Sequence, residues 1–325
     1  MASPTRNYSH RPLVALSRVD SHDGLVIEGG SVRNDPELTF DIDAADVISL
    51  FSQPWLISDE SFAAMCKIAE QFDLQSLVSK PDGARAAIPL FEDQYDDGQG
   101  YLKVENGIGI VAIDGPIVKD PNLFDRLFFG ASDMDAISAA IEEAGDRPDV
   151  KSVLLDINSP GGTVIGTPEL ASAVRQLARD KYVFAFTDGM MASAAYWIGS
   201  QADSIYATPS SRVGSVGVLQ TVTNRTDQLK MSGVTVETFS AGKYKSAGSP
   251  HAPLTDEQRA MIQANVDEIH GDFKAAVLAR GRQIPPEAME GQDFTGKNAA
   301  DNKMVTGLVQ NRKQVIGKLM ARAMI

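Results

Sequence analysis

Three short segments carry residue types that could do chemistry, and each follows a predicted strand. Residues 158–162 read Asn-Ser-Pro-Gly-Gly, and the two glycines let the backbone present N–H groups close to a ligand. Residues 188–196 surround Ser193 with small residues at the start of a helical stretch, where backbone N–H groups suit a developing negative charge. Residues 240–250 place two lysines among Gly, Ala and Ser. Together the segments offer a hydroxyl nucleophile, an amine base and backbone donors.

Taken singly, each segment has an ordinary structural explanation. Residues 158–162 fit a strand-to-helix turn, Ser193 fits a helix N-cap, and an exposed lysine is usually a solvated charge. The combination is more specific than its parts. Four ordered motifs closely resemble the signal peptide peptidase A family, and in particular its phage head-maturation proteases. They are Asn-Ser-Pro-Gly-Gly at 158–162, the segment around Ser193, Gly-Ser-Val-Gly-Val at 214–218 and Tyr-Lys-Ser-Ala at 244–247.

This resemblance covers roughly residues 107–309 and includes the stretches 210–218 and 296–301. It implies an α/β fold shared with caseinolytic protease subunits and crotonases, a ClpP/crotonase-like spiral of ββα units. We therefore expect a serine peptidase domain over residues 101–312, followed by a C-terminal helical tail over 313–325. The resemblance implies no metal and no organic cofactor.

The family's nucleophile corresponds to Ser193, and its general base corresponds to Lys245 rather than Lys243. A serine hydroxyl needs a neighbouring base to attack an amide. A lysine serves as that base near neutral pH only where desolvation or positive neighbours lower its pKa, so apolar surroundings are required. Either Ser215 or Ser246 is a candidate to hold the lysine amine in place.

The oxyanion hole of the family corresponds here to the backbone N–H groups of Ala194 and of Gly161 or Gly162. Ala194 replaces a glycine that often follows the nucleophile, which leaves the backbone donor in place. Lys303 stands where a glycine is usual in the late Ala-x-x-x-Gly-Leu motif. No scaffold-like tail follows residue 325, so we expect any scaffolding function to come from another chain.

The hydrophobic pattern predicts the elements that must position these groups. Short strands alternating with helices are typical of an α/β domain with buried, largely parallel strands. We expect strands at 107–113, 150–157, 182–186, 205–207, 216–219 and 234–239. We expect helices capped by Ser132, by Thr167 with Pro168 next, and by Thr255, the last reaching about Arg282 with a capping box to Gln258.

Residues 1–100 form a mostly irregular or helical N-terminal segment, a candidate targeting region or propeptide. It holds one predicted helix within 51–72, which Ser58 or Ser61 could cap, and a linker over 80–100 that is rich in Asp, Gly and Gln. The start of the chain lacks the continuous apolar segment of a signal peptide. No run approaches the ~18 apolar residues of a membrane span.

Composition excludes several functions. The formal net charge is −13 and no Lys/Arg stripe is present, which argues against nucleic-acid binding. The single cysteine, Cys66, cannot form an internal disulfide or a thiolate metal cluster. The sequence contains no His-Glu-x-x-His motif, which argues against a zinc hydrolase. Ser193 is not part of a Gly-x-Ser-x-Gly motif, the nucleophile elbow of α/β-hydrolases. For a Ser-His-Asp hydrolase only His251 is a serious candidate, because His270 lies beside an apolar helix stripe and is better explained as structural.

We therefore expect a serine endopeptidase that cleaves its own chain and scaffold, portal or capsid proteins during phage prohead maturation, in the host cytoplasm or the prohead. The resemblance also implies a homo-oligomer whose neighbouring subunits complete each active site. The alternatives are a bacterial signal-peptide peptidase-like protease, a catalytically inactive assembly protein of the same fold, and a crotonase-like acyl-CoA enzyme. The pair of Ser193 and Lys245 argues against the last two.

Overall fold

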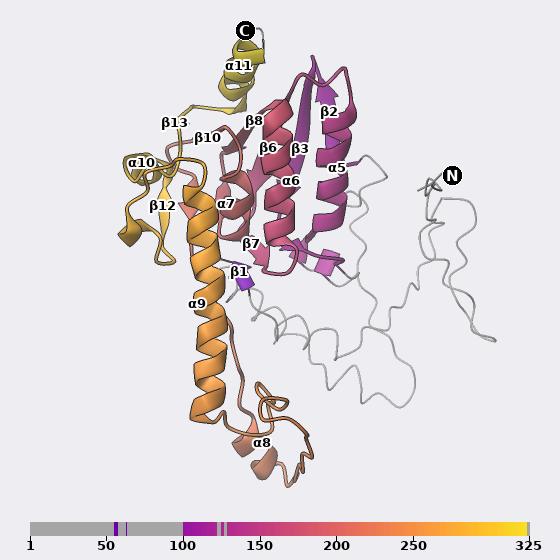
Figure 1. The fold of residues 1–325 in the computed structure, drawn as a ribbon, viewed down its shortest axis with the longest axis vertical. Coiled ribbons are helices and arrows are strands. Elements are labelled where there is room, and N and C mark those ends of the chain that lie inside the picture. The colour runs from indigo at the N-terminus through magenta and orange to yellow at the C-terminus, as the bar shows by residue number, and fades with distance from the viewer. Residues whose placement is uncertain (1–54, 58–62, 64–99, 122–124, 127–128, 324–325) are drawn as a thin grey trace, which may run out of the picture. The chain divides into compact units, whose positions relative to one another are not determined.

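The computed structural model describes residues 55–57, 63, 100–121, 125–126 and 129–323 (Figure 1). Three ββα units follow one another in it, which confirms the predicted α/β class and the succession of ββα units. The units are β3 (Ile108–Asp114), β4 (Ile117–Val118) and α5 (Met134–Asp146), then β6 (Ser152–Asn158), β7 (Gly161–Thr163) and α6 (Thr167–Asp180), then β8 (Tyr182–Thr187), β9 (Met190–Ala192) and α7 (Ala194–Gly199).

The strands form three sheets. The largest has the order β13-β10-β8-β6-β3-β2, in which only the β2–β3 pair is antiparallel. Two smaller sheets have the orders β1-β7-β4-β5 and β12-β11-β9. The remaining strands are β1 (Trp55–Ile57), β2 (Leu102–Glu105), β5 (Ser132–Asp133), β10 (Ser204–Ala207), β11 (Arg212–Gly214), β12 (Asp293–Thr295) and β13 (Gly307–Leu308). The remaining helices are α8 (Thr226–Met231), α9 (Asp256–Leu278), the 3-10 helix Pro286–Ala288, α10 (Gly296–Asp301) and α11 (Arg312–Ala323).

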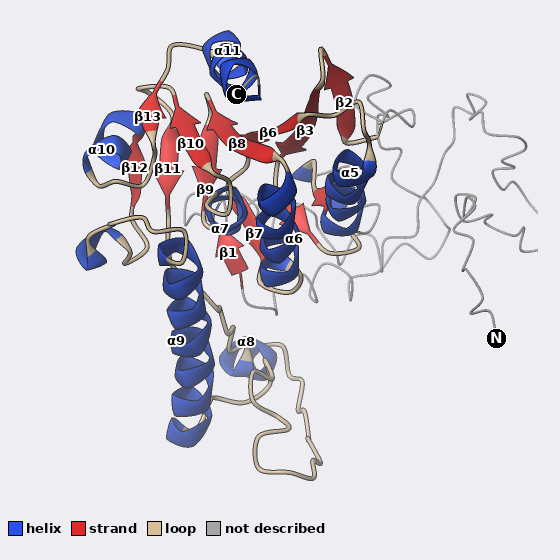
Figure 2. Ribbon diagram, turned by 45° about the horizontal axis from the view of Figure 1, so that its top comes forward, coloured by secondary structure: helices blue, strands red, loops and turns tan. Residues whose placement is uncertain are grey.

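The large sheet is buried on both faces, as expected for parallel strands. Val153 and Leu155 of β6 belong to the core shared with α5, α6 and α7. Leu154, between them, points the other way and belongs to a second core that includes Val315 and Leu319 of α11. Figure 2 shows α11 across the sheet from α5 and α6. The continuous apolar run of β6 therefore reflects burial on two sides.

Two predicted helix caps are wrong by one residue. Asp133, not Ser132, is the N-cap of α5, because its side chain accepts from the Asp135 N–H, whereas the Ser132 hydroxyl donates to the Asp114 carbonyl. Thr167 is the first residue of α6, and its hydroxyl donates to the Thr163 carbonyl at 2.7 Å. In both cases the hydroxyl that was expected to cap the helix donates instead to a carbonyl of a neighbouring strand.

Two predicted strands are also wrong. Residues 216–219 form no strand, because Ser215 turns the chain with a φ of 53°, and Leu219 makes only an isolated bridge to Trp55. The strand of this region is β11, which ends at Gly214. Residues 234–239 form no strand either, and all six are exposed. An alternating pattern shows which face of a strand could be buried, but it does not provide the neighbouring strand with which the backbone must hydrogen-bond.

The long helix α9 begins as predicted and ends a little earlier. Thr255 is its N-cap, with the complete capping box to Gln258. Its buried apolar residues, Phe273 and Val277, lie in the C-terminal half: Phe273 is fully covered and stacks on Trp197 of α7 with ring centroids 4.6 Å apart. The N-terminal half, whose apolar stripe includes Val266, is only partly covered. In Figure 1 this half extends with α8 away from the sheets.

Lys303 explains why a glycine is usual at its position. Its φ is 61°, in the left-handed region that costs an L-residue roughly 1–2 kcal/mol. Lys303→Gly is therefore expected to stabilise the protein by about 0.5–1 kcal/mol in chemical denaturation, after allowance for glycine's greater freedom in the unfolded chain. Lys297→Gly, on the exposed face of α10, is the matched control and should destabilise it by about 0.5–1 kcal/mol. A loss of stability in Lys303→Gly would show that the turn carries no strain.

Candidate active site

Ser193 stands at the junction between β9 and α7 in a strained conformation. Its φ and ψ are 52° and −120°, outside the regions that non-glycine residues normally occupy. Its N–H donates to the Gly214 carbonyl at 2.8 Å, and its carbonyl accepts from the Trp197 N–H at 2.9 Å. Its hydroxyl caps no helix N–H and reaches only the Gly217 carbonyl, at 3.5 Å. The backbone is thus held firmly while the hydroxyl has no strong partner among the described residues, so a structural N-cap does not account for Ser193.

The segment 158–162 is bound to the strand that carries Ser193. The Ser159 N–H donates to the Met190 carbonyl at 2.7 Å, and the Ala192 N–H donates to the Ser159 carbonyl at 3.1 Å. The Asn158 side-chain oxygen accepts from the Met190 N–H at 3.2 Å. The structure therefore brings the first two sequence motifs together.

The two glycines of this segment are required by close packing. Gly161 has a φ of 115°, and a methyl group added there would lie 2.9 Å from the Ser193 Cβ and overlap the Leu56 carbonyl. A methyl group on Gly162 would overlap the Ile117 carbonyl. The Gly161 N–H donates to the Ser159 hydroxyl at 3.2 Å. Gly161 thus lies directly against Ser193, and Ala194, the next residue along the chain, is the first residue of α7.

The third motif, residues 214–218, lies beside the same serine. Ser215 is buried, and its N–H donates to the Gln292 carbonyl at 2.7 Å. His270 of α9 holds the next residue: its Nε2 lies 3.0 Å from the Val216 carbonyl and 2.9 Å from the Met289 carbonyl. His270 is therefore a structural residue, as the sequence predicts. Ser215 lies between Gly214 and Gly217, whose carbonyls accept from the N–H and the hydroxyl of Ser193.

The fourth motif is not brought to the others within this chain. Lys245 is exposed, in a turn in which its N–H donates to the Gly242 carbonyl at 3.2 Å. Ser246 is in the same turn and half-buried, and His251 follows it and is exposed. This turn connects α8 to α9, at the end of α9 away from the sheets in Figure 1.

The distance between the Lys245 turn and Ser193 can be estimated from the length of α9. Lys243 pairs with Glu257, in the first turn of α9, at 2.9 Å. Trp197, four residues after Ser193, stacks on Phe273 near the other end. At 1.5 Å of rise per residue, Glu257 and Phe273 lie roughly 24 Å apart along the helix axis. The lysine turn and Ser193 are therefore at opposite ends of α9.

The two lysines of this turn differ in their partners. The hydrogen bond to Glu257 raises the pKa of Lys243, which makes that amine a poorer base. Among the described residues no ion-pair partner is within reach of Lys245. Of the two lysines, Lys245 is therefore the better candidate for a general base, because its amine is not held in an ion pair within the described part of the chain.

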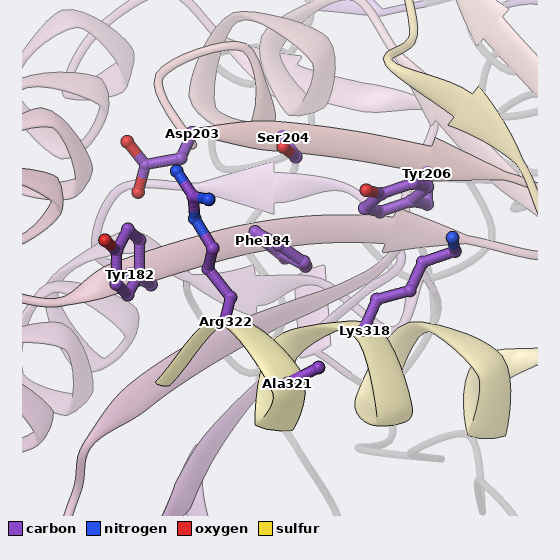
Figure 3. Close-up of a pocket in the computed structure, with 8 residues that line it drawn as sticks. All are labelled: Tyr182, Phe184, Asp203, Ser204, Tyr206, Lys318, Ala321 and Arg322. Carbon is purple, nitrogen blue, oxygen red and sulfur yellow. The ribbon is translucent and has the colours of Figure 1, made fainter. Parts of the chain in front are cut away.

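A separate groove lies between the large sheet and α11 (Figure 3). The Lys318 ammonium lies 5.6 Å from the Tyr206 ring centre, and the Arg322 guanidinium lies 5.1 Å from that of Tyr182. Ser193 does not line this groove, which is on the face covered by α11. It takes no part in the candidate active site.

The fold and the geometry around Ser193 thus define an α/β protein of repeated ββα units with a strained, buried serine between two glycine-containing loops. Residues 175–325 match the model of peptidase family S49. Residues 175–325 thus resemble a peptidase S49 domain, and the predicted resemblance to the signal peptide peptidase A family is confirmed.

Three curated relatives describe this likeness. The putative protease MJ0651 of Methanocaldococcus jannaschii is 43% identical over 124 residues, 38% of this chain and 40% of that protein. Capsid assembly protease C of Escherichia phage lambda is 28% identical over 80% of this chain and 62% of its own length. The putative signal peptide peptidase SppA of Enterococcus faecium is 30% identical over 66% of this chain and 62% of its own. The chain thus spans 40% to 62% of the lengths of these relatives.

Sequence reasoning missed one part of the site, the strand β1. Residues 55–57 pair with β7 at the glycines beside Ser193. They lie just before Ser58 and Ser61, the two predicted caps of the helix expected within 51–72. Most of that helix lies outside the described residues, as do Cys66, His10 and His22. The apolar triplet Trp55-Leu56-Ile57 was the available signal, but three residues do not show which strand they pair with.

Proposed function

We propose that this protein is a serine endopeptidase with Ser193 as nucleophile and Lys245 as general base. The observation that carries the proposal is the backbone arrangement at Ser193: a strained serine, held between Gly214 and α7, with Gly161 against its Cβ. Strain of this kind is concentrated at functional sites. The peptidase S49 match, which includes both Ser193 and Lys245, supports the same reading.

The reaction would proceed in two steps. Lys245 Nζ takes the proton of the Ser193 hydroxyl as Oγ attacks the substrate carbonyl carbon, and it returns that proton to the leaving amine. Water then hydrolyses the acyl-enzyme with the same lysine as base. The N–H of Ala194, one of the first in a helix and therefore without an intrahelical partner, stabilises the oxyanion together with that of Gly161 or Gly162. No step uses a metal or an organic cofactor.

We propose further that Lys245 acts on Ser193 of a neighbouring copy. Lys245 is about one helix length from the serine of its own chain, which excludes direct proton transfer in the arrangement described. The segment that carries it also exposes large apolar side chains: Met231 is 90% and Phe239 is 91% exposed. A second copy covering this segment would bury them and provide the apolar surroundings that a lysine base requires. Ser215 beside the nucleophile, or Ser246 beside Lys245, would then orient the amine.

For the substrate we propose scaffold, portal or capsid proteins of a phage prohead, together with the chain itself. The support is the likeness to capsid assembly protease C of phage lambda over 80% of this chain. No helix among the described residues is long and apolar enough to span a membrane. The site of action would be the host cytoplasm or the prohead.

Coexpression with these head proteins tests the function. Wild type should shorten at least one of them, as seen by mass spectrometry. His251→Ala should do so within about twofold of wild type, because the proposal assigns the base to Lys245 and His251 is an exposed side chain with no role in the reaction. A His251→Ala chain that no longer cleaves would restore the Ser-His rival. Intact head proteins with every variant would favour an assembly protein without activity.

A further inference from the structure

The strand β1 lies between two segments of the site and pairs with both. On one side it is antiparallel to β7, with Leu56 opposite Gly162 and Ile57 opposite Gly161. On the other side the Trp55 N–H donates to the Leu219 carbonyl at 2.9 Å, and the Leu219 N–H donates to the Trp55 carbonyl at 3.1 Å. Backbone groups alternate in direction along a strand, so those of Leu56 point toward Gly162. The segment thus fills the space between the glycine loop and the chain that follows residues 214–218.

The end of β1 at Ile57 is next to the nucleophile. Gly161, which is paired with Ile57, is the residue on which an added methyl would lie 2.9 Å from the Ser193 Cβ. Ser193 itself is 0% exposed. A substrate carbonyl has to reach the Ser193 hydroxyl, so the site as it stands is closed.

The side chains of β1 are buried in the way expected for a bound extended peptide. Leu56 enters the main core, whereas Trp55 and Ile57 point to the opposite side, into a small apolar cluster with Val118 and Ala131. All three β1 side chains are at most 3% exposed. Main-chain pairing on an exposed strand edge combined with pockets for alternate side chains is the general way in which a protein binds an extended peptide.

We infer that β1 is a built-in pseudosubstrate, which occupies the groove in which an extended, apolar substrate peptide must lie beside Ser193 and keeps the peptidase closed until it leaves. This inference rests on the proposed function for the role of Ser193. The groove selects segments with an apolar residue at each of three successive positions, like Trp55-Leu56-Ile57. Substrate enters by exchange with β1, so activity depends on how readily β1 detaches.

A peptide added in trans tests this exchange in a Ser193→Ala background, where no cleavage interferes. The probe is a fluorescein-labelled peptide with the sequence of residues 52–60, followed by fluorescence anisotropy. Leu56→Asp places a charge in the core and should expel β1, so the variant should bind the peptide at least tenfold more tightly than the parent. Ile165→Asp, at a side chain 59% exposed, is the matched control and should bind like the parent. A folded Leu56→Asp chain that binds no more tightly would overturn the inference.

Hydrogen exchange in the wild-type chain gives a second measurement that needs no destabilising variant. If β1 detaches while the body stays folded, the Trp55 and Leu219 amides should exchange at least 100-fold faster than those of Val153 and Leu154 in β6. Equal rates would show that β1 unfolds only with the whole domain and would overturn the inference. Both readouts are independent of catalysis. A Leu56→Asp chain with Ser193 intact that binds the peptide tightly but cleaves no substrate would count against the proposed function and leave the outcome for β1 unaffected.

Discussion

Ser193→Ala is expected to reduce peptide cleavage by at least about 10³-fold, as the loss of a nucleophile does in serine peptidases. The fold should be preserved, because among the described residues the buried hydroxyl makes one long hydrogen bond, at 3.5 Å, and a change in stability of about 1 kcal/mol or less is expected. Cleavage of a quenched fluorescent peptide and thermal unfolding measure the two effects. Activity within tenfold of wild type would show that another residue is the nucleophile.

Lys245→Ala should cause a loss of the same order, since nucleophile and base act as one unit. Lys243→Ala is the matched control, two residues away in the same turn, and should retain activity because that amine is paired with Glu257. If Lys243→Ala were the inactive variant, the assignment of the base would be reversed.

Gly162→Ala is expected to lower stability and activity together. Its methyl group would overlap the Ile117 backbone, which cannot move as a flexible side chain could, so a loss of about 1–3 kcal/mol in the free energy of unfolding follows. Displacing an oxyanion donor adds a loss of about 10²–10³ in rate. Urea denaturation and peptide cleavage measure the two losses.

Gly271→Ala provides the control for that substitution. Gly271 lies within α9, and nothing stands within 4 Å of an added methyl group. The variant should keep full activity and gain up to about 1 kcal/mol, because alanine favours helix. A Gly162→Ala chain as stable and as active as Gly271→Ala would show that the loop neither packs as described nor takes part in catalysis.

Local sequence patterns predicted the parts of this fold that short-range physics controls. The strands β3, β6 and β8 and the capped helix α9 are all marked by apolar runs or by a capping box. The predicted strand at 234–239 failed because its pattern contains no information about a partner strand. Pairing between β1 and β7 joins residues about a hundred positions apart, and no local pattern specifies such a contact.

The candidate site was predictable in its members but not in its geometry. The motifs around Gly161 and Ser193 meet in the structure because they follow strands of the ββα units, and Ser215 joins them because it follows β11, which pairs with β9. Lys245 does not join them, since the helix α9 that follows its turn carries it away from the body. The sequence identifies the serine, the lysine and the glycines as candidate site residues. In the proposed shared site, the assembly of the copies decides which copy supplies the lysine.

Mixing two inactive chains tests the central claim, a Ser-Lys site shared between copies, most directly. Ser193→Ala and Lys245→Ala chains are coexpressed in equal amounts and assayed for peptide cleavage. If each site takes its serine from one copy and its lysine from the next, random assembly restores about a quarter of wild-type activity, because half the copies keep each residue. If serine and lysine come from the same chain, every chain in the mixture lacks one of them, and the mixture stays as inactive as either variant alone.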